Sequence, residues 1–194
     1  MIQAKQIFEE APRKLVHLSG LLLLPFLFRF SLFVVWGLAA ASVFYLIVEL
    51  LRIRRKEIRF VSQWVHACKR ASEMKTISWA APLLAVGIML SISFFIYPAT
   101  ACGLIHACLA DTAAALVGRR WGETKIFYSS HKSYLGSAAY FTTALLATLF
   151  YVPFWIALPL AVIGMVLESF PIRDWDNFLI PLGVSFSASL LLWP

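Results

Sequence analysis

The chain has 194 residues, of which 61% are hydrophobic and only 14% are charged. Soluble globular domains have about 45–50% apolar and about 25% charged residues, so this composition excludes an ordinary soluble enzyme and indicates a protein embedded in lipid. The net charge of +7 does not indicate a nucleic-acid partner, because the basic residues lie in short segments between apolar runs, where they orient a membrane protein. The three cysteines form no CxxC pair, so neither a disulfide framework nor a zinc site is expected.

Apolar runs follow one another along the whole chain, and each is long enough to cross or nearly cross a hydrocarbon core of about 30 Å. They predict an all-α protein, a polytopic transmembrane bundle of about seven helices, in which 1–194 form a single domain. The break at Arg29-Phe30-Ser31 predicts a tight turn. No cleavable signal peptide is expected, because the first run exceeds the usual length of a signal-peptide core. The predicted helices are 15–30, 31–51, 77–97, 99–117, 136–152, 153–168 and 177–193.

Lysine and arginine cluster before the first predicted helix, after the second and after the fourth. With a cytoplasmic N-terminus and seven crossings, these clusters all fall on the cytoplasmic side and only Arg29 falls outside. The sequence therefore predicts a multi-pass protein of a prokaryotic cytoplasmic membrane. The connections 52–76 and 118–135 lie on its inner side, and 52–76 is expected to follow the interface as a loop or an amphipathic helix.

A carboxylate lies within the fourth predicted helix. Placing an acid inside a membrane segment costs roughly 2.5–3.5 kcal/mol, so such residues usually have a function. Asp111 shares one helix face with the small residues Ala107, Ala115 and Gly118. This face predicts a closely packed helix that presents a carboxylate. By contrast, His106 is interpreted as a packing histidine.

The connection 118–135 brings cations, hydroxyls and glycine to the start of the fifth predicted helix. Ser133 is predicted to cap this helix, and the free backbone N–H groups beside Lys132 form a positive concavity that suits phosphate oxygens. Gly136 allows close approach of a ligand or another backbone segment. The alternative is an ordinary capped loop that follows the positive-inside rule.

Oxygen-rich side chains crowd the turn before the last predicted helix, where Glu168, Asp174 and Asp176 precede the only asparagine, Asn177. Such groups suit Mg²⁺, which takes one or two carboxylates plus substrate phosphates. Alternatively, Asp176 and Asn177 only cap the helix. At the start of the chain, Arg13-Lys14-Leu15-Val16-His17 places Lys14 and His17 on one helical face. The sequence contains no Walker A or kinase glycine-rich motif.

The ordered set RKLVH, DTAAALVGRRWGETK, HKSYLGS and ES-x(4)-DWDNFLIPL resembles the CTP-dependent lipid kinase family of dolichol kinase and phytol kinase, which is related to phosphatidate cytidylyltransferase. The resemblance spans nearly the whole chain. It implies CTP as phosphoryl donor, Mg²⁺ as cofactor, and a long-chain lipid alcohol of the polyprenol, phytol or diacylglycerol type as acceptor. The chain departs from the family pattern at Ala110 and Leu135, where the family usually has Gly and often has Glu.

The resemblance and the residue chemistry together give a predicted site, with 118–135 as its nucleotide loop. The predicted catalytic residues are Asp111, Lys132, Glu168 and Asp176. The predicted metal ligands are Asp111, Glu168, Asp174 and Asp176. The predicted nucleotide-binding residues are Thr112, Gly118, Arg120, Gly122, Lys125, Lys132, Ser133, Gly136, Ser137 and Asn177. Arg13, Lys14 and His17 are predicted to complete the site.

Two alternatives to a lipid kinase remain open at this point. A cytidylyltransferase would attack the α-phosphorus of CTP and make a CDP-lipid. A small transporter would also place acids and cations within helices, although here the polar groups gather at the cytoplasmic rim. The partners expected for a kinase are CTP, the lipid acceptor and membrane lipids, with no nucleic acid and an oligomeric state that the sequence leaves open.

Overall fold

The protein is described by a computed structural model that covers residues 12–54, 76–129, 131–171 and 174–193. Within these ranges it is all-helical, with six continuous helical segments and no named strand. The all-α class is therefore confirmed. The predicted segment 52–76 lies outside the described residues except at its two ends.

Two of the segments are long. The first, Pro12–Ile53, contains the 3₁₀ turn η1 (Gly20–Leu23) and α2 (Leu24–Ile53). The other, Tyr97–Trp121, contains α5 (Tyr97–Ile105), the π-helix η3 (His106–Ala110) and α6 (Asp111–Trp121). The remaining segments are α4 (Ala80–Phe94), α7 (Tyr134–Thr148), α8 (Phe154–Ser169) and α9 (Asp176–Leu192).

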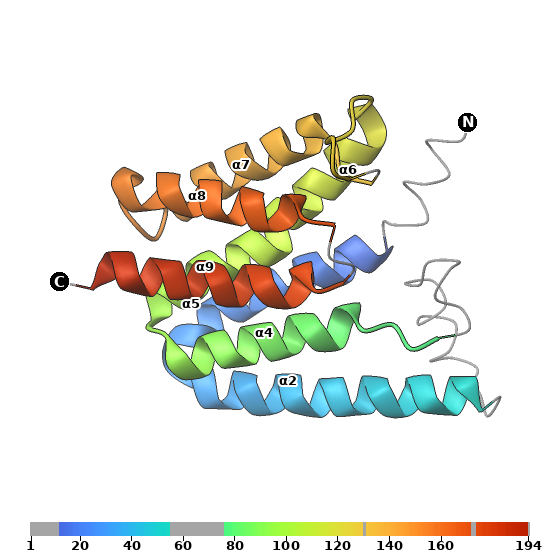
Figure 1. Ribbon diagram of the computed structural model, residues 1–194. Helices are drawn as coiled ribbons and strands as arrows, with labels where there is room; N and C mark the ends of the chain where they lie inside the picture. The colour runs from blue at the N-terminus through green and yellow to red at the C-terminus, as the bar shows by residue number, and fades with distance from the viewer. Residues whose placement is uncertain (1–11, 55–75, 130, 172–173, 194) are drawn as a thin grey trace.

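The first segment bends at Phe30, whose backbone angles (φ −129°, ψ 35°) are not helical. The parts before and after this kink run in different directions (Figure 1). The kink falls at the break that the sequence predicts, but the predicted helices 15–30 and 31–51 form one bent segment. The count of seven separate helices is consequently not confirmed.

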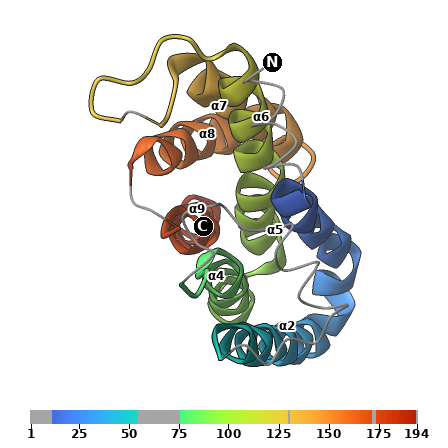
Figure 2. The ribbon, with the colours of Figure 1, turned by 90° about the vertical axis from the view of Figure 1, so that its right-hand side faces the viewer.

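Helix α9 lies in the middle of the bundle, packed against α4, α5 and α8, while α6 packs on α7 (Figure 2). Glycines allow the close approach of α9 to its neighbours. A Cβ at Gly87 would lie 2.9 Å from the carbonyl oxygen of Phe178, and a Cβ at Gly103 would lie 2.4 Å from that of Pro181. Small residues at such crossings are typical of helices that associate within lipid, where van der Waals contact replaces the hydrophobic effect as the driving force.

By length and composition, Pro12–Ile53 and Tyr97–Trp121 are candidate membrane spans, and α4, α8 and α9 are apolar but shorter. The first span is mostly exposed on the protein surface and carries large apolar side chains there. Phe28, Phe33 and Trp36 are 78%, 76% and 68% exposed. An apolar surface of this extent favours contact with lipid. The number of crossings and the cytoplasmic N-terminus stay predictions.

The close approach of α5 and α9 can be tested by adding one methyl group. Gly103→Ala should lower the free energy of unfolding by about 1–3 kcal/mol, because the new Cβ meets Ser185 and Pro181 in a packed interface. Gly37→Ala is the matched control, since nothing lies within 4 Å of a Cβ at Gly37. Thermal unfolding in detergent measures both variants, and equal melting temperatures would contradict the packing described here.

Candidate active site

The loop between α6 and α7 folds back on itself, so that its two ends lie side by side. The backbone N–H of Ile126 donates to the carbonyl of Lys132 (3.0 Å), and that of Tyr134 donates to Thr124 (3.2 Å). An isolated bridge between Lys125 and Ser133 accompanies these bonds. The loop is also tied to α8, because the Tyr128 hydroxyl donates to the Ser169 hydroxyl (2.7 Å). These contacts fix the position of Lys132, which precedes the cap residue of α7.

The predicted cap of the helix is confirmed. The Ser133 Oγ accepts a hydrogen bond from the backbone N–H of Gly136 (3.1 Å). Around this cap the end of α6 and the start of α7 lie so close together that a side chain would not fit between them. A Cβ at Gly122 would lie 2.1 Å from the Ser133 Oγ, and a Cβ at Gly118 would lie 3.3 Å from the Gly136 Cα. The three glycines thus bring the end of α6 against the first turn of α7.

Lys132 joins three segments that are far apart in the sequence. Its Nζ donates to Glu168 Oε1 at the end of α8 (2.6 Å) and lies 3.5 Å from Asp176 Oδ2 at the start of α9. The second carboxylate oxygen of Glu168 accepts a bond from the Ser137 hydroxyl in the first turn of α7 (3.4 Å). The start of α7, the end of α8 and the start of α9 lie at the same end of the bundle (Figure 1).

The surroundings of Lys132 stabilise its charged form. Burial by itself would lower the pKa of Lys132. The negative charges of Glu168, Asp111 and Asp176 have the larger combined effect and raise this pKa above the ordinary lysine value. The side chain is consequently an ammonium at neutral pH. Its contribution to stability is fully present below the ordinary lysine pKa and is lost only as the pH rises through the raised pKa of the folded state.

Asp111 begins α6 and is buried, with 6% of its surface exposed. The Lys14 ammonium donates to Asp111 Oδ2, and the His17 Nδ1 lies 3.7 Å from the same oxygen. The predicted RKLVH segment therefore does meet the predicted acid of the fourth helix. The charge of Asp111 also contributes to the raised pKa of Lys132.

The turn before α9 is held by its own polar side chains. Asp174 has a left-handed backbone conformation (φ 52°), and Arg13 Nη2 lies 3.5 Å from its Oδ1. The side-chain amide of Asn177 donates to the backbone carbonyl of Asp174 (3.0 Å). The backbone N–H of Asn177 donates to Asp176 Oδ1 (2.9 Å). Asn177 therefore has a structural role in this turn. Its predicted nucleotide contact stays a prediction.

Three of the predicted nucleotide-binding residues take no part in the ion pairs of Lys132 with Glu168 and Asp176. The Thr112 hydroxyl donates to the backbone carbonyl of Cys108 (2.6 Å) within its own helix. The Arg120 guanidinium stacks 5.1 Å from the centre of the Trp121 ring, and Lys125 is exposed. Their predicted roles stay predictions.

The four predicted metal ligands do not form one ligand set. In the described ranges no group of three Asp, Glu, His or Cys side chains is arranged to hold a metal ion. Asp111 pairs with Lys14, and Asp174 pairs with Arg13. Glu168 and Asp176 instead share Lys132 as partner. Mg²⁺ needs only one or two protein carboxylates when substrate phosphates supply the other oxygen ligands. Glu168 and Asp176 are two carboxylates of this kind.

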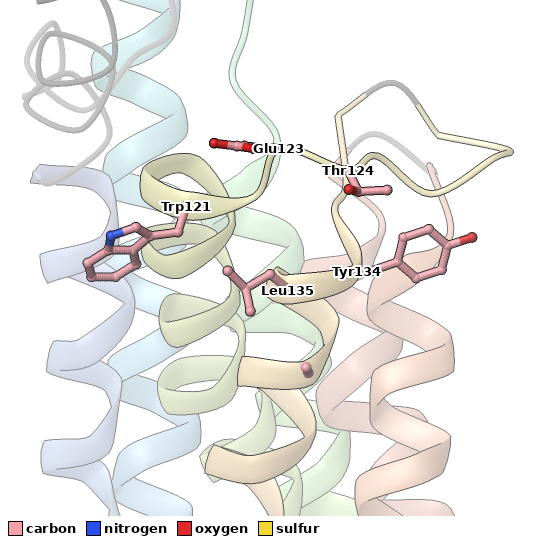
Figure 3. Close-up of a pocket in the computed structure, with 6 residues that line it drawn as sticks. Trp121, Glu123, Thr124, Tyr134 and Leu135 are labelled. Atoms are coloured by element: carbon pink, nitrogen blue, oxygen red, sulfur yellow. The ribbon is translucent and has the colours of Figure 1, made fainter.

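A cavity that the sequence did not predict lies beside the α6–α7 loop. It has a volume of about 460 Å³ and is lined by Trp121, Glu123, Thr124, Tyr134, Leu135 and Ala138. Figure 3 shows Trp121 and Tyr134 pointing away from each other on either side of Leu135. The signal in the sequence was the pair of aromatic residues that flank the loop. Leu135, where the family named by the resemblance often has Glu, lines this cavity.

Comparison with curated proteins supports a relationship to CTP-dependent lipid kinases. Over 141 residues the chain is 28% identical to CTP-dependent diacylglycerol kinase 1 of Saccharomyces cerevisiae (strain ATCC 204508 / S288c). The match covers 71% of this chain and 48% of the yeast protein, so the chain spans about half the length of this relative. No family model matches the chain, and no solved structure matches it. The similarity does not support polyprenol or phytol in particular.

Removing Lys132 should destabilise the protein because it leaves Glu168 buried without its cation. Lys132→Ala should cost about 3 kcal/mol of unfolding free energy, and adding Glu168→Gln should recover part of that loss. Lys125→Ala is the control, since this exposed side chain should change stability by less than about 0.5 kcal/mol. Denaturant unfolding in detergent measures all variants. A Lys132→Ala protein as stable as the control would refute the ion pair.

Proposed function

We propose that this protein transfers a phosphoryl group from CTP to the hydroxyl group of a membrane lipid. The similarity to a CTP-dependent diacylglycerol kinase supports this chemistry, and so does the apolar surface of the first helical segment. One observation carries the proposal: the Lys132 ammonium at the entrance to α7 is paired with Glu168 at the end of α8 and lies 3.5 Å from Asp176 at the start of α9. Phosphoryl transfer needs mainly such positioning and charge stabilisation.

Lys132 is the residue that we assign to the phosphates of CTP. It is an ammonium at the entrance to α7, with 23% of its side chain exposed, and its partner oxygens are those of carboxylates. Phosphate oxygens are acceptors of the same kind, so they can replace Glu168 or Asp176 as its partners. The first turn of α7 adds backbone N–H groups and the positive end of the helix dipole. Ser137 lies in this first turn and donates to the same carboxylate that Lys132 contacts.

Asp111 is the residue that we assign to the acceptor hydroxyl. In the transfer, the hydroxyl oxygen forms a bond to the γ-phosphorus, the bond from that phosphorus to the β-phosphate oxygen breaks, and CDP leaves. The hydroxyl proton must pass to a base. Asp111 is a buried carboxylate that the Lys14 ammonium orients, and we assign to it the acceptance of this proton. The hydrocarbon tail of the acceptor would remain in the lipid beside the exposed helices.

Mg²⁺ belongs to the proposal as the companion of the nucleotide. Glu168 and Asp176 are the residues that would hold it, because both already face one cation. When bound with CTP, the ion would neutralise charge on the phosphate oxygens. The acceptor is proposed from the diacylglycerol, polyprenol and phytol types, with diacylglycerol first because the yeast relative is named for it.

The arrangement in the membrane is part of the same proposal. We take residues 1–194 as one domain that crosses the membrane several times, with the cluster on the cytoplasmic side, where CTP is available. The positive-inside pattern of the connections supports this orientation.

The test of the proposal is transfer from labelled CTP by the purified protein with Mg²⁺ and, in turn, diacylglycerol, polyprenol and phytol. We expect γ-labelled CTP to yield labelled lipid monophosphate and CDP, with loss of activity in EDTA and recovery on adding Mg²⁺. Formation of CDP-lipid and pyrophosphate would instead identify a cytidylyltransferase. Absence of any labelled lipid across the panel would defeat the proposal.

Asp111→Asn should reduce kcat by about 10²–10⁴-fold, because an amide cannot accept the hydroxyl proton. Size-exclusion chromatography in detergent checks that the variant remains folded. Arg29→Gln is the control: this exposed cation lies beside the kink at Phe30, and its loss should leave kcat unchanged. Near-normal turnover by Asp111→Asn would remove Asp111 from the reaction.

A further inference from the structure

The described part of the chain contains a second buried polar cluster that the proposed reaction does not use. His106, at the start of η3, is fully buried. Its Nδ1 lies 3.2 Å from the Tyr140 hydroxyl and its Nε2 lies 3.2 Å from the Thr148 hydroxyl, both on α7. A polar ring in an apolar bundle is costly unless both nitrogens are bonded. The sequence favoured plain packing for this histidine, but the structure gives it a defined partner at each nitrogen.

Helix α8 closes this cluster from a further side. A Cβ at Gly164 would lie 2.3 Å from the His106 Nδ1 and 2.7 Å from the Tyr140 hydroxyl. The absence of a side chain at this position lets α8 pack directly onto the ring. The imidazole is thus fixed by hydrogen bonds from one helix and by close packing against another.

The backbone of His106 is linked directly to Asp111. In η3 the Asp111 N–H donates to the His106 carbonyl, five residues earlier, and not to the residue four earlier as in an α-helix. Such a π-turn holds one extra residue. Since successive residues of an α-helix are rotated by about 100°, the extra residue turns the Asp111 side chain by about that angle relative to an uninterrupted helix. With this rotation Asp111 contacts Lys14 and His17.

We propose that His106 is a positioning residue for Asp111. The anchored ring fixes the carbonyl that receives the Asp111 N–H, and the π-turn then directs the carboxylate into the site while His106 keeps its bonds to α7. This inference rests on the proposed function for its effect on catalysis. Its structural part, the dependence of the Lys14–Asp111 contact on His106, does not.

Zero-length cross-linking tests the structural part without any assay of activity. A carbodiimide joins a lysine amine to a carboxylate that is in contact with it, and mass spectrometry of the full-length protein in detergent quantifies each product. We expect His106→Phe to reduce the Lys14–Asp111 product at least five-fold. The Lys132–Glu168 product should not change, which makes it an internal control. An unchanged Lys14–Asp111 product, or none in the unmodified protein, would overturn the proposal.

Kinetics test the catalytic part. His106→Phe should lower kcat at least ten-fold per folded molecule and change the KM for CTP much less, because the contacts of Lys132 with Glu168 and Asp176 do not involve His106. His106→Gln, which keeps a donor and an acceptor, should restore part of the loss. Thr148→Val removes only one partner, so it should fold and lower kcat to a smaller extent. A purely structural role would instead lower the folded fraction and leave kcat per folded molecule unchanged, and that result would refute the assignment.

The two experiments separate the failure of this inference from the failure of the proposed function. If the unmodified protein transfers no phosphate to any lipid, the proposed function fails. The cross-linking ratio still decides whether His106 positions Asp111. If transfer is observed and His106→Phe changes neither measurement, only the inference about His106 fails.

Discussion

The burial of carboxylates among apolar helices is the constraint on which the rest of this structure depends. Asp111 and Glu168 are 6% and 4% exposed, and an isolated charge in such surroundings costs several kcal/mol. Each acid therefore has a cation, Lys14 for the first and Lys132 for the second. Both cations come from segments distant in the sequence. The need to pair charges thus brings the start of the first helix and the α6–α7 loop to the ends of α6, α8 and α9.

The same pairs explain how one structure can be stable and still suit a polyanionic substrate. Lys132 is held by two carboxylates at 2.6 and 3.5 Å and retains partial exposure, so a phosphate group would exchange one set of oxygen partners for another. The cost of desolvating the ammonium has already been met in folding. Under the proposed function, such a cluster is organised before the nucleotide arrives, as electrostatic stabilisation of phosphoryl transfer requires. Glu49 and Arg52, by contrast, form a pair within one helix.

Glycines and the π-turn set the fine geometry around these charges. Gly118, Gly122 and Gly136 allow the loop and two helices to meet at Ser133, and η3 rotates the helix that carries Asp111. The motif glycines were visible in the sequence, but their contacts were not. Nothing in the order of residues 106–110 distinguishes a π-turn from an α-helix, because the choice depends on the bonds of His106 to α7 and of Asp111 to the first helical segment.

The sequence by itself determined the helical class, most of the helix positions, the break near Phe30 and the cap at Ser133, because apolar runs, turn residues and caps act through local physical preferences. The resemblance to a lipid kinase family adds the prediction that Asp111, Lys14, Lys132, Glu168 and Asp176 belong to one site. Only the tertiary structure decided which acid pairs with which cation, and that Asp174 turns to Arg13. Partner choice between buried charges depends on how helices pack and rotate, which no local pattern encodes.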